Sequence, residues 1–127
     1  MNGFAVKIEE SSKELTAKER IAFKDMSNAK KLDLEVEAGT ALIIVPDAYV
    51  VLAVHNEKSD NKDYYNYCIV DKNGTKYVTG SESFWSTFKG IWDDMHEYAP
   101  DEEFEVQVYK VESKNYKGKY FLTCSII

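Results

Sequence analysis

Three lysines and two tyrosines lie within eight residues of a chain that is acidic overall. The segment runs from Ser113 to Tyr120 with the sequence SKNYKGKY, and apolar and polar residues alternate on both sides of it. Lysine side chains attract phosphates and release their counterions, and a tyrosine ring offers a flat face to any nucleobase. This composition predicts a loop that binds a polyanion with accessible bases. The alternative is a basic hairpin turn whose side chains are only solvated.

Charge is spread unevenly along the 127 residues, whose net charge is −6. The acidic total argues against binding through bulk electrostatics. Lys110–Tyr120 nevertheless holds four lysines and one acid, whereas Asp93–Glu105 holds seven acids and no lysine or arginine. A local basic patch is therefore compatible with an acidic whole.

The two cysteines, Cys68 and Cys124, each lie inside an apolar run, where a small buried residue is the usual interpretation. We therefore expect no disulfide framework, and we expect the protein to occupy a reducing compartment. No stretch approaches the roughly 18 apolar residues of a membrane span. We therefore expect a soluble protein in the cytoplasm, without membrane contact.

The chain shows strand signals on both sides of one helix signal. Apolar, β-rich runs predict strands at 49–55, 64–70, 75–79, 104–110 and 120–126, and Asn-Gly at 73–74 predicts a tight hairpin turn. A helix is expected to begin at Ser81 or Ser83 and to end before Pro100. Its single apolar face is formed by Phe84, Phe88, Ile91, Trp92 and Met95.

Three strands, a helix and two strands follow one another in the OB-fold, a five-stranded Greek-key barrel. We predict a mainly β protein with one such domain over 1–127, comprising an N-terminal extension (1–40) and a barrel core (41–127). Within 1–40, Arg20–Asp25 is interpreted as a short strand, although Thr16 and Glu19 form a capping-box pattern that favours a helix. A strand is also expected at Ala41–Val45. An SH3-like barrel and an α+β sandwich remain open.

In the OB-fold, ligands bind strands two and three and the loops between strands one and two and between strands four and five. Tyr65 and Tyr67 share one face of the second strand, and Tyr77 lies on the third, so these rings are expected to form a stacking platform. We interpret Tyr65 and Tyr67 as facing outward because the other face carries Cys68 and Val70, which are more easily buried. The opposite orientation remains open.

The phosphate contacts are expected from lysines of the same surface, with Tyr116 at the loop tip as the strongest stacking candidate. No apolar neighbour in the sequence is placed to bury the Tyr116 ring. A solvated surface lysine is the alternative for each cation. The candidate phosphate contacts are Lys76, Lys114, Lys117 and Lys119.

Three stretches resemble small single-stranded-DNA-binding proteins that are encoded by phages and prophages of Gram-positive bacteria. They are KDMSNA at 24–29, KYVTGSESFW at 76–85, and SKNYKGK at 113–119 with FLTC at 121–124. The resemblance spans most of the chain and implies protection of single-stranded DNA during phage DNA replication or recombination. Phage or host replication proteins would be further partners. The final TCSII lacks a disordered acidic tail, so recruitment through such a tail is not expected; a homo-oligomer is compatible with the sequence.

No catalytic residue, metal or cofactor is expected. His55 and His96 lack a metal-ligand spacing with the cysteines, and the adjacent carboxylates Asp93 and Asp94 diverge on a helix. A phosphate-cradling glycine loop and a nucleophile elbow are both missing from the sequence. The rival hypothesis is a protein-binding phage factor whose acidic surface, 93–105, mimics DNA and blocks a host nuclease or defence complex. A structural module without a ligand is a third option.

Overall fold

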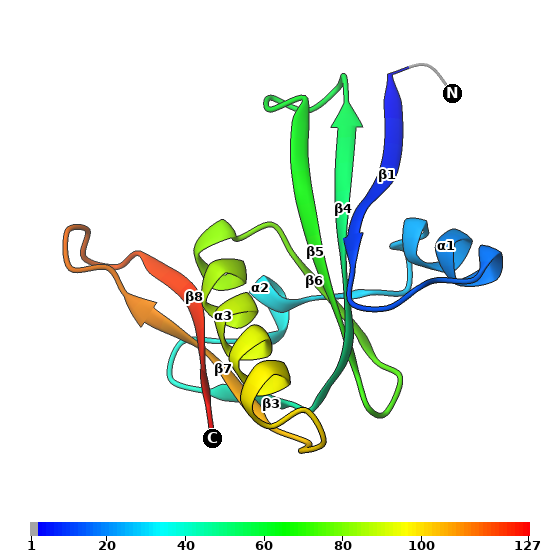
Figure 1. Cartoon of the computed structure of the whole chain (residues 1–127). Helices are drawn as coiled ribbons and strands as arrows, with labels where there is room; N and C mark the ends of the chain where they lie inside the picture. Colours follow the sequence, from blue (N-terminus) through cyan, green and yellow to red (C-terminus); the bar gives the residue numbers. More distant parts are fainter. Residues whose placement is uncertain (1–2) are drawn as a thin grey trace. The chain divides into compact units, whose positions relative to one another are not determined.

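The computed structural model describes residues 3–127, which form two compact units (Figure 1). Unit 1 consists of the residues up to Lys31 together with Asp47–Gly80, and unit 2 consists of Leu32–Pro46 together with Ser81–Ile127. Each unit is therefore built from two segments that are separate in the sequence. Strands make up 42% of the structure and helices 23%, which confirms a mainly β protein.

The sheet of unit 1 has five strands in the order β1-β4-β5-β6-β2. Strands β1 and β4 are antiparallel, as are β5 and β6, whereas β2 runs parallel to β6. The predicted hairpin joins β5 to β6, and Gly74 adopts the positive φ of 92° that its turn requires. The bounds are β1 (Phe4–Ser11), β2 (Lys30–Lys31), β4 (Pro46–Asn56), β5 (Asp63–Asp71) and β6 (Lys76–Thr79).

Helix α1 (Ala17–Lys24) covers one face of this sheet, where Phe23 joins a buried cluster with Val50, Leu52, Val54 and Cys68. The helix begins with a complete capping box. The backbone N–H of Glu19 donates to the Thr16 hydroxyl at 3.2 Å, and the N–H of Thr16 donates to the Glu19 carboxylate at 3.0 Å. The strand predicted at Arg20–Asp25 is therefore wrong, because these bonds satisfy helical donors that an extended segment would not present.

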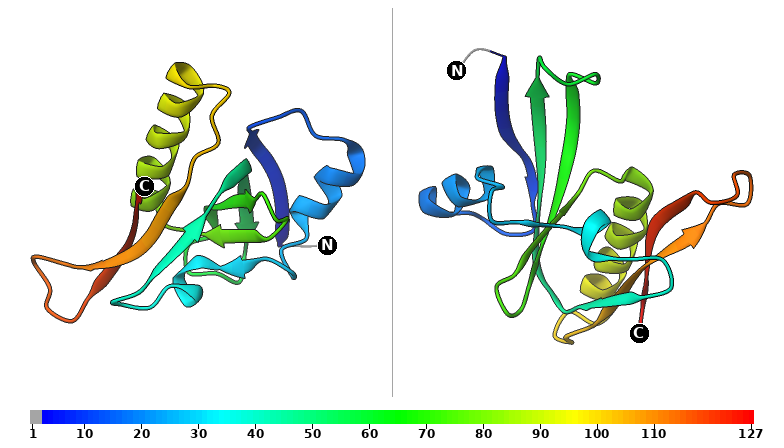
Figure 2. Two further views of the ribbon diagram at one scale, coloured as in Figure 1. Left: turned by 90° about the horizontal axis from the view of Figure 1, so that it is seen from below. Right: turned by 180° about the vertical axis from the view of Figure 1, so that it is seen from behind.

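Unit 2 contains a three-stranded antiparallel sheet in the order β3-β7-β8. Helix α3 packs against β8 (Figure 2) and buries Phe84, Phe88 and Trp92. Its N-cap is Ser81, whose hydroxyl accepts from the Phe84 N–H at 3.2 Å. The bounds are α2 (Leu32–Glu35), β3 (Ala41–Ile44), α3 (Glu82–Tyr98), β7 (Val106–Glu112) and β8 (Tyr120–Ile126).

The five strands predicted for the barrel, the strand predicted at Ala41–Val45 and the helix predicted after Ser81 are present, but the strands between residues 3 and 127 form two separate sheets. Strands β4, β5 and β6 lie in unit 1, and β7 and β8 lie in unit 2. The predicted five-stranded barrel is not found in the described chain. Closure of the barrel required strand pairings that the local sequence does not specify. In the structure β4 lies between β1 and β5, and β7 lies between β3 and β8.

Within residues 3–127, no helix is long and apolar enough to cross a membrane. Cys68 and Cys124 are both free thiols and both buried, one in each unit. Burial raises the pKa of each thiol to about 12.

Candidate nucleic-acid interface

The basic loop, residues 113–119, joins β7 to β8 and projects from the end of the unit 2 sheet (Figure 1). It is closed at its base by the Ser113 N–H, which donates to the carbonyl of Lys119 at 2.8 Å. At its tip, the N–H of Lys119 donates to the carbonyl of Tyr116 at 3.2 Å, and Gly118 adopts a φ of 80°. A residue with a side chain is strained at this φ, so the glycine fixes the turn that presents Tyr116 and Lys117.

Tyr116 is 64% exposed, as expected for an aromatic side chain at a loop tip. The ammonium group of Lys119 lies 5.6 Å from the centre of its ring, within the range of a cation–π interaction. Such a contact contributes about 0.5–1 kcal/mol at an exposed site, less than the roughly 1–3 kcal/mol of a stacked base. A nucleobase can therefore replace the lysine on the ring, and the lysine remains beside it for a phosphate.

The other lysines of the basic loop are free to bind an anion. Lys114 and Lys117 are exposed and have no hydrogen bond or ion pair within the described chain. The loop itself contains no acid, and its nearest acidic neighbour in the sequence is Glu112. The loop therefore carries three lysines and one exposed tyrosine ring, with Lys119 beside that ring.

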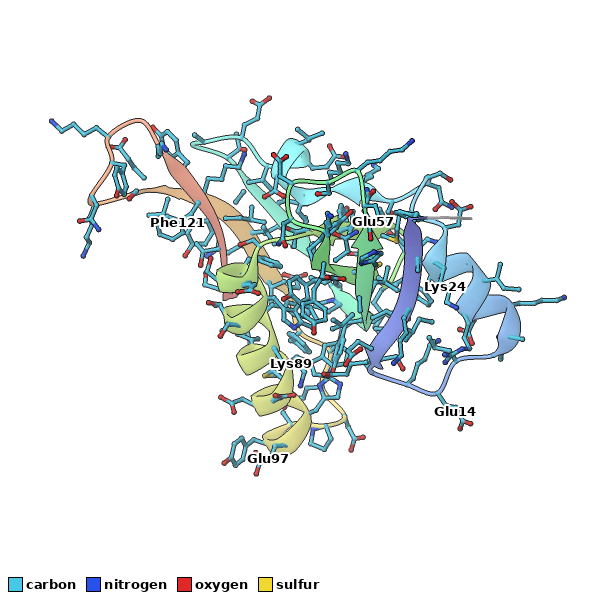
Figure 3. All side chains as sticks on the ribbon, turned by 90° about the horizontal axis from the view of Figure 1, so that it is seen from above. Glu14, Lys24, Glu57, Lys89, Glu97 and Phe121 are labelled. Atoms are coloured by element: carbon cyan, nitrogen blue, oxygen red, sulfur yellow. The ribbon has the colours of Figure 1, made fainter. Side chains whose placement is uncertain are left out.

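An open face of the unit 2 sheet continues the surface of the basic loop. Val106, Val108, Leu122 and Cys124 form the buried face of β7 and β8. On the other face the register pairs Val111 with Phe121, and Phe121 is 47% exposed (Figure 3).

Tyr109 is a diagonal neighbour of Phe121 on this open face, because it pairs with Thr123. Diagonal positions of antiparallel strands lie about 7–8 Å apart. An open hollow of about 370 Å³ borders Tyr109 on the side of β3, where Gln107 and Ala41 also line it. Sequence analysis missed Tyr109 and Phe121 as candidates, although their alternation with Val108 and Leu122 placed them opposite the buried face.

In unit 1 the three tyrosines of the predicted platform differ in their exposure to solvent. Tyr65 is 44% exposed, whereas Tyr67 is 6% and Tyr77 is 8% exposed. The predicted open platform is therefore wrong for Tyr67 and Tyr77. Cys68 and Val70 pack on the side of α1, but Tyr67, on the face predicted to point outward, is buried as well. The error arose because this sheet is buried on part of both faces, so facing away from α1 does not mean facing solvent.

Lys76 is occupied by contacts within unit 1. Its ammonium group donates to the carbonyl of Ala22 at 3.1 Å, near the C-terminal end of α1, and lies 5.5 Å from the ring centre of Phe23. A cation near the C-terminus of a helix is stabilised by the helix dipole. We therefore correct the prediction for Lys76, which holds α1 on the sheet and is not free for a phosphate.

The candidate residues thus divide between the two units. Unit 1 holds Tyr65, with Tyr67 and Tyr77 buried and Lys76 engaged, and unit 2 holds Lys114, Tyr116, Lys117 and Lys119. Only the group in unit 2 combines an exposed ring with free cations on one loop.

The acidic surface lies elsewhere in unit 2. The basic loop leaves one end of β7, and the acid-rich segment from the end of α3 enters the other end. Figure 3 shows the two places, with Phe121 beside the basic loop and Glu97 near the end of α3. Every acid between Asp93 and Glu105 is exposed. Among residues 3–127 no three His, Cys, Asp or Glu side chains come together as a metal site.

No protein-family model, no curated protein and no solved structure matches this chain. The resemblance carried by 24–29, 76–85 and 113–124 therefore stays a prediction, and the candidate interface stands on its geometry.

Proposed function

We propose that this protein binds single-stranded DNA without sequence preference, through the basic loop and the adjoining open face of the unit 2 sheet. The observation that carries the proposal is the exposed ring of Tyr116, which contacts Lys119 and shares a glycine-fixed loop with two further exposed lysines. Stacking requires unpaired bases, and lysines bind the phosphates between them irrespective of sequence. Tyr109 and Phe121 extend the stacking surface along the sheet.

A role in phage DNA replication or recombination is part of the proposal, and the three stretches that resemble phage single-stranded-DNA-binding proteins support it. The order β4-β5-β6-α3-β7-β8 also supports a relation to the OB-fold, whose loop between strands four and five corresponds to the basic loop. Neither relation is needed for the binding chemistry, which depends on the loop itself.

Fluorescence anisotropy with a labelled oligo(dT) and a duplex of equal length tests the proposal. We expect binding of the single strand, much weaker binding of the duplex, and a logarithmic salt slope of about −2, because single strands contribute about −0.7 for each of three phosphates. Equal affinity for the two forms would exclude stacking as the basis of recognition.

The acidic part of unit 2 favours a second candidate function, the binding of a basic protein surface as a DNA mimic. Unit 2 contains twelve acids and five lysines, and its acids between Asp93 and Glu105 form an exposed series. This function predicts no affinity for oligo(dT) at any salt concentration. The same titration therefore separates the two candidates.

A further inference from the structure

A hollow of about 350 Å³ lies on the sheet of unit 1, where β1, β4 and β5 run side by side (Figure 1). Ala5 and Ala53, which we call its floor, have the smallest side chains among the lining residues, and Lys7, His55 and Tyr65 also line it. The register pairs Ala5 with His55 and Lys7 with Ala53, so all four side chains lie on one face. The volume is at the small end of the range for ligand pockets.

This face is the one that points away from α1. His55 contacts Asp63 on β5, so Asp63 lies on the same face, and alternation adds Tyr65. Tyr64, between them, packs on the opposite side against the cluster that includes Phe23. Val6, Val54 and Tyr64 also line the hollow, and their side chains belong to the cluster beneath α1, so the hollow adjoins that core.

The wall formed by His55 is held by hydrogen bonds at both ring nitrogens. Nδ1 of the ring lies 2.7 Å from the Asp63 carboxylate, and Nε2 lies 2.7 Å from the Glu57 carboxylate. The hydrogen bond to Asp63 contributes most and the bond to Glu57 adds to it, and together they raise the pKa of His55 above its ordinary value of 6.5. Lys62 pairs with the second oxygen of Glu57 at 3.2 Å. The Glu57 carboxylate thus contacts both the imidazole of His55 and the ammonium group of Lys62, and both ring nitrogens of His55 are engaged by carboxylates.

Lys7 and Tyr65 are the groups that remain available. Lys7 is exposed and has no hydrogen bond or ion pair within residues 3–127. The ring of Tyr65 stacks on that of Tyr67, with centres 6.4 Å apart and planes 27° apart. Because Tyr67 is buried and next to Tyr65 on the same face of β5, it packs against one side of the exposed ring. The hollow therefore combines a supported aromatic ring, an apolar floor and one uncompensated cation.

We propose that this hollow is a second binding site that takes one nucleotide, whose base stacks on Tyr65 above Ala5 and Ala53 and whose phosphate pairs with Lys7. The inference rests on the proposed function in one respect, that the nucleotide is normally a residue of the bound single strand. A free nucleoside monophosphate has the same chemistry, so both forms serve as probes.

The methyl groups of the floor report occupancy directly. The full chain is labelled with ¹³C at its alanine methyl groups and titrated with dTMP and, separately, with oligo(dT). We expect the Ala5 and Ala53 resonances to shift in both titrations, because a stacked base places its ring current over them. Ala17 and Ala22, on α1, serve as internal references and should not move. Unchanged Ala5 and Ala53 resonances at saturation with oligo(dT) would overturn the site.

Filling the hollow provides a test by substitution. Ala53→Leu should abolish the dTMP response and lower affinity for oligo(dT) about tenfold, the value of one stacked base. Ala22→Leu adds the same side chain at an exposed position of α1. It should leave the dTMP response and the affinity for oligo(dT) unchanged. If Ala53→Leu fails to fold, Lys7→Gln replaces it with Lys18→Gln as its control. Lys7→Gln should weaken the dTMP response several-fold, and an unaltered response would overturn the assignment of the phosphate.

The two proposals fail separately. Shifts of Ala5 and Ala53 with dTMP, together with no affinity for oligo(dT), would support the hollow and contradict the proposed function. Affinity for oligo(dT) that is unaffected by Ala53→Leu, with both floor methyl resonances unmoved, would support the proposed function and overturn the hollow.

Discussion

Strand β5 of unit 1 and the basic loop of unit 2 use tyrosine in opposite ways. On β5, Tyr67 is 6% exposed and supports Tyr65, so its ring contributes to packing. On the loop, Tyr116 is 64% exposed and contacts only the ammonium group of Lys119 among the ring contacts that the structure describes. The comparison shows that a position at a loop tip predicts an available ring, whereas alternation along a strand predicts only the face.

The two units also differ in charge. Unit 1 has eleven lysines and arginines and ten acids, whereas unit 2 has five lysines and twelve acids. The basic loop thus lies in the more acidic unit, and its three lysines are most of the positive charge that unit 2 contains. Binding there depends on local geometry, because the field of the whole unit repels an anion.

The largest expected effect is on the stability of the protein, to which Tyr67 and Tyr116 should contribute very differently. Tyr67→Ala should lower the free energy of unfolding by about 3 kcal/mol, because removal of a large buried ring leaves a cavity. Tyr116→Ala should change it by less than about 0.5 kcal/mol, as is usual for exposed positions. Urea denaturation followed by circular dichroism measures both. Equal destabilisation by the two substitutions would contradict the assignment of Tyr116 to the surface.

The next effect concerns affinity for the single strand. Tyr116→Ala should weaken binding of oligo(dT) by roughly 1–3 kcal/mol through lost stacking, with little change in the salt slope. Tyr116→Phe keeps the ring and is the matched control, so it should retain nearly all of the affinity. Anisotropy titrations compare the three proteins. Loss of affinity in Tyr116→Phe as well would mean that the hydroxyl group, and not the ring face, makes the contact.

A smaller effect distinguishes the free lysines from Lys76. The double substitution Lys114→Ala with Lys117→Ala should flatten the salt slope by about one to two units. Lys76→Ala should leave the slope unchanged and instead lower stability, because it removes the bond to Ala22 at the end of α1. Titrations at several salt concentrations measure the slopes. A flatter slope in Lys76→Ala would restore that lysine to the interface.

The smallest effect concerns the reactivity of the two buried thiols, one in each unit, which reports whether that unit is folded. Burial raises the pKa of Cys68 and of Cys124 to about 12, so both should react with iodoacetamide at pH 8 far more slowly than in urea. The raised pKa favours the folded state below the unfolded value of about 8.5, and this contribution is lost as the pH rises toward 12. Peptide mass spectrometry follows each cysteine separately. Labelling of either thiol at the unfolded rate would show that its unit is open.

Local signals predicted most of the secondary structure. The alternation at 64–70 and 120–126, the Asn-Gly turn and the apolar face of α3 each identified an element that the structure contains. The capping box at Thr16 was also a correct signal, but the alternation of Ile21 and Phe23 was given more weight. Strand β1 was missed although Phe4, Val6 and Ile8 alternate with polar or small residues.

Long-range pairing was the part that the sequence did not specify. Nothing local indicates that β1 pairs with β4 or that β3 pairs with β7, so the division into two sheets was not predicted. The same limit applies to the candidate site. The exposure of Tyr116 followed from its loop, but the burial of Tyr77 and the contact of Lys76 with α1 depend on tertiary packing.

The location of the bound strand tests the central claim most directly. Backbone amide resonances of the ¹⁵N-labelled chain, followed during titration with oligo(dT), report every contacted segment at once. We predict the largest shifts in residues 113–119 and at Tyr109 and Phe121, with residues 93–105 unmoved. Shifts confined to 93–105, or the absence of any shift at saturating oligo(dT), would contradict the assignment of the basic loop as the nucleic-acid interface.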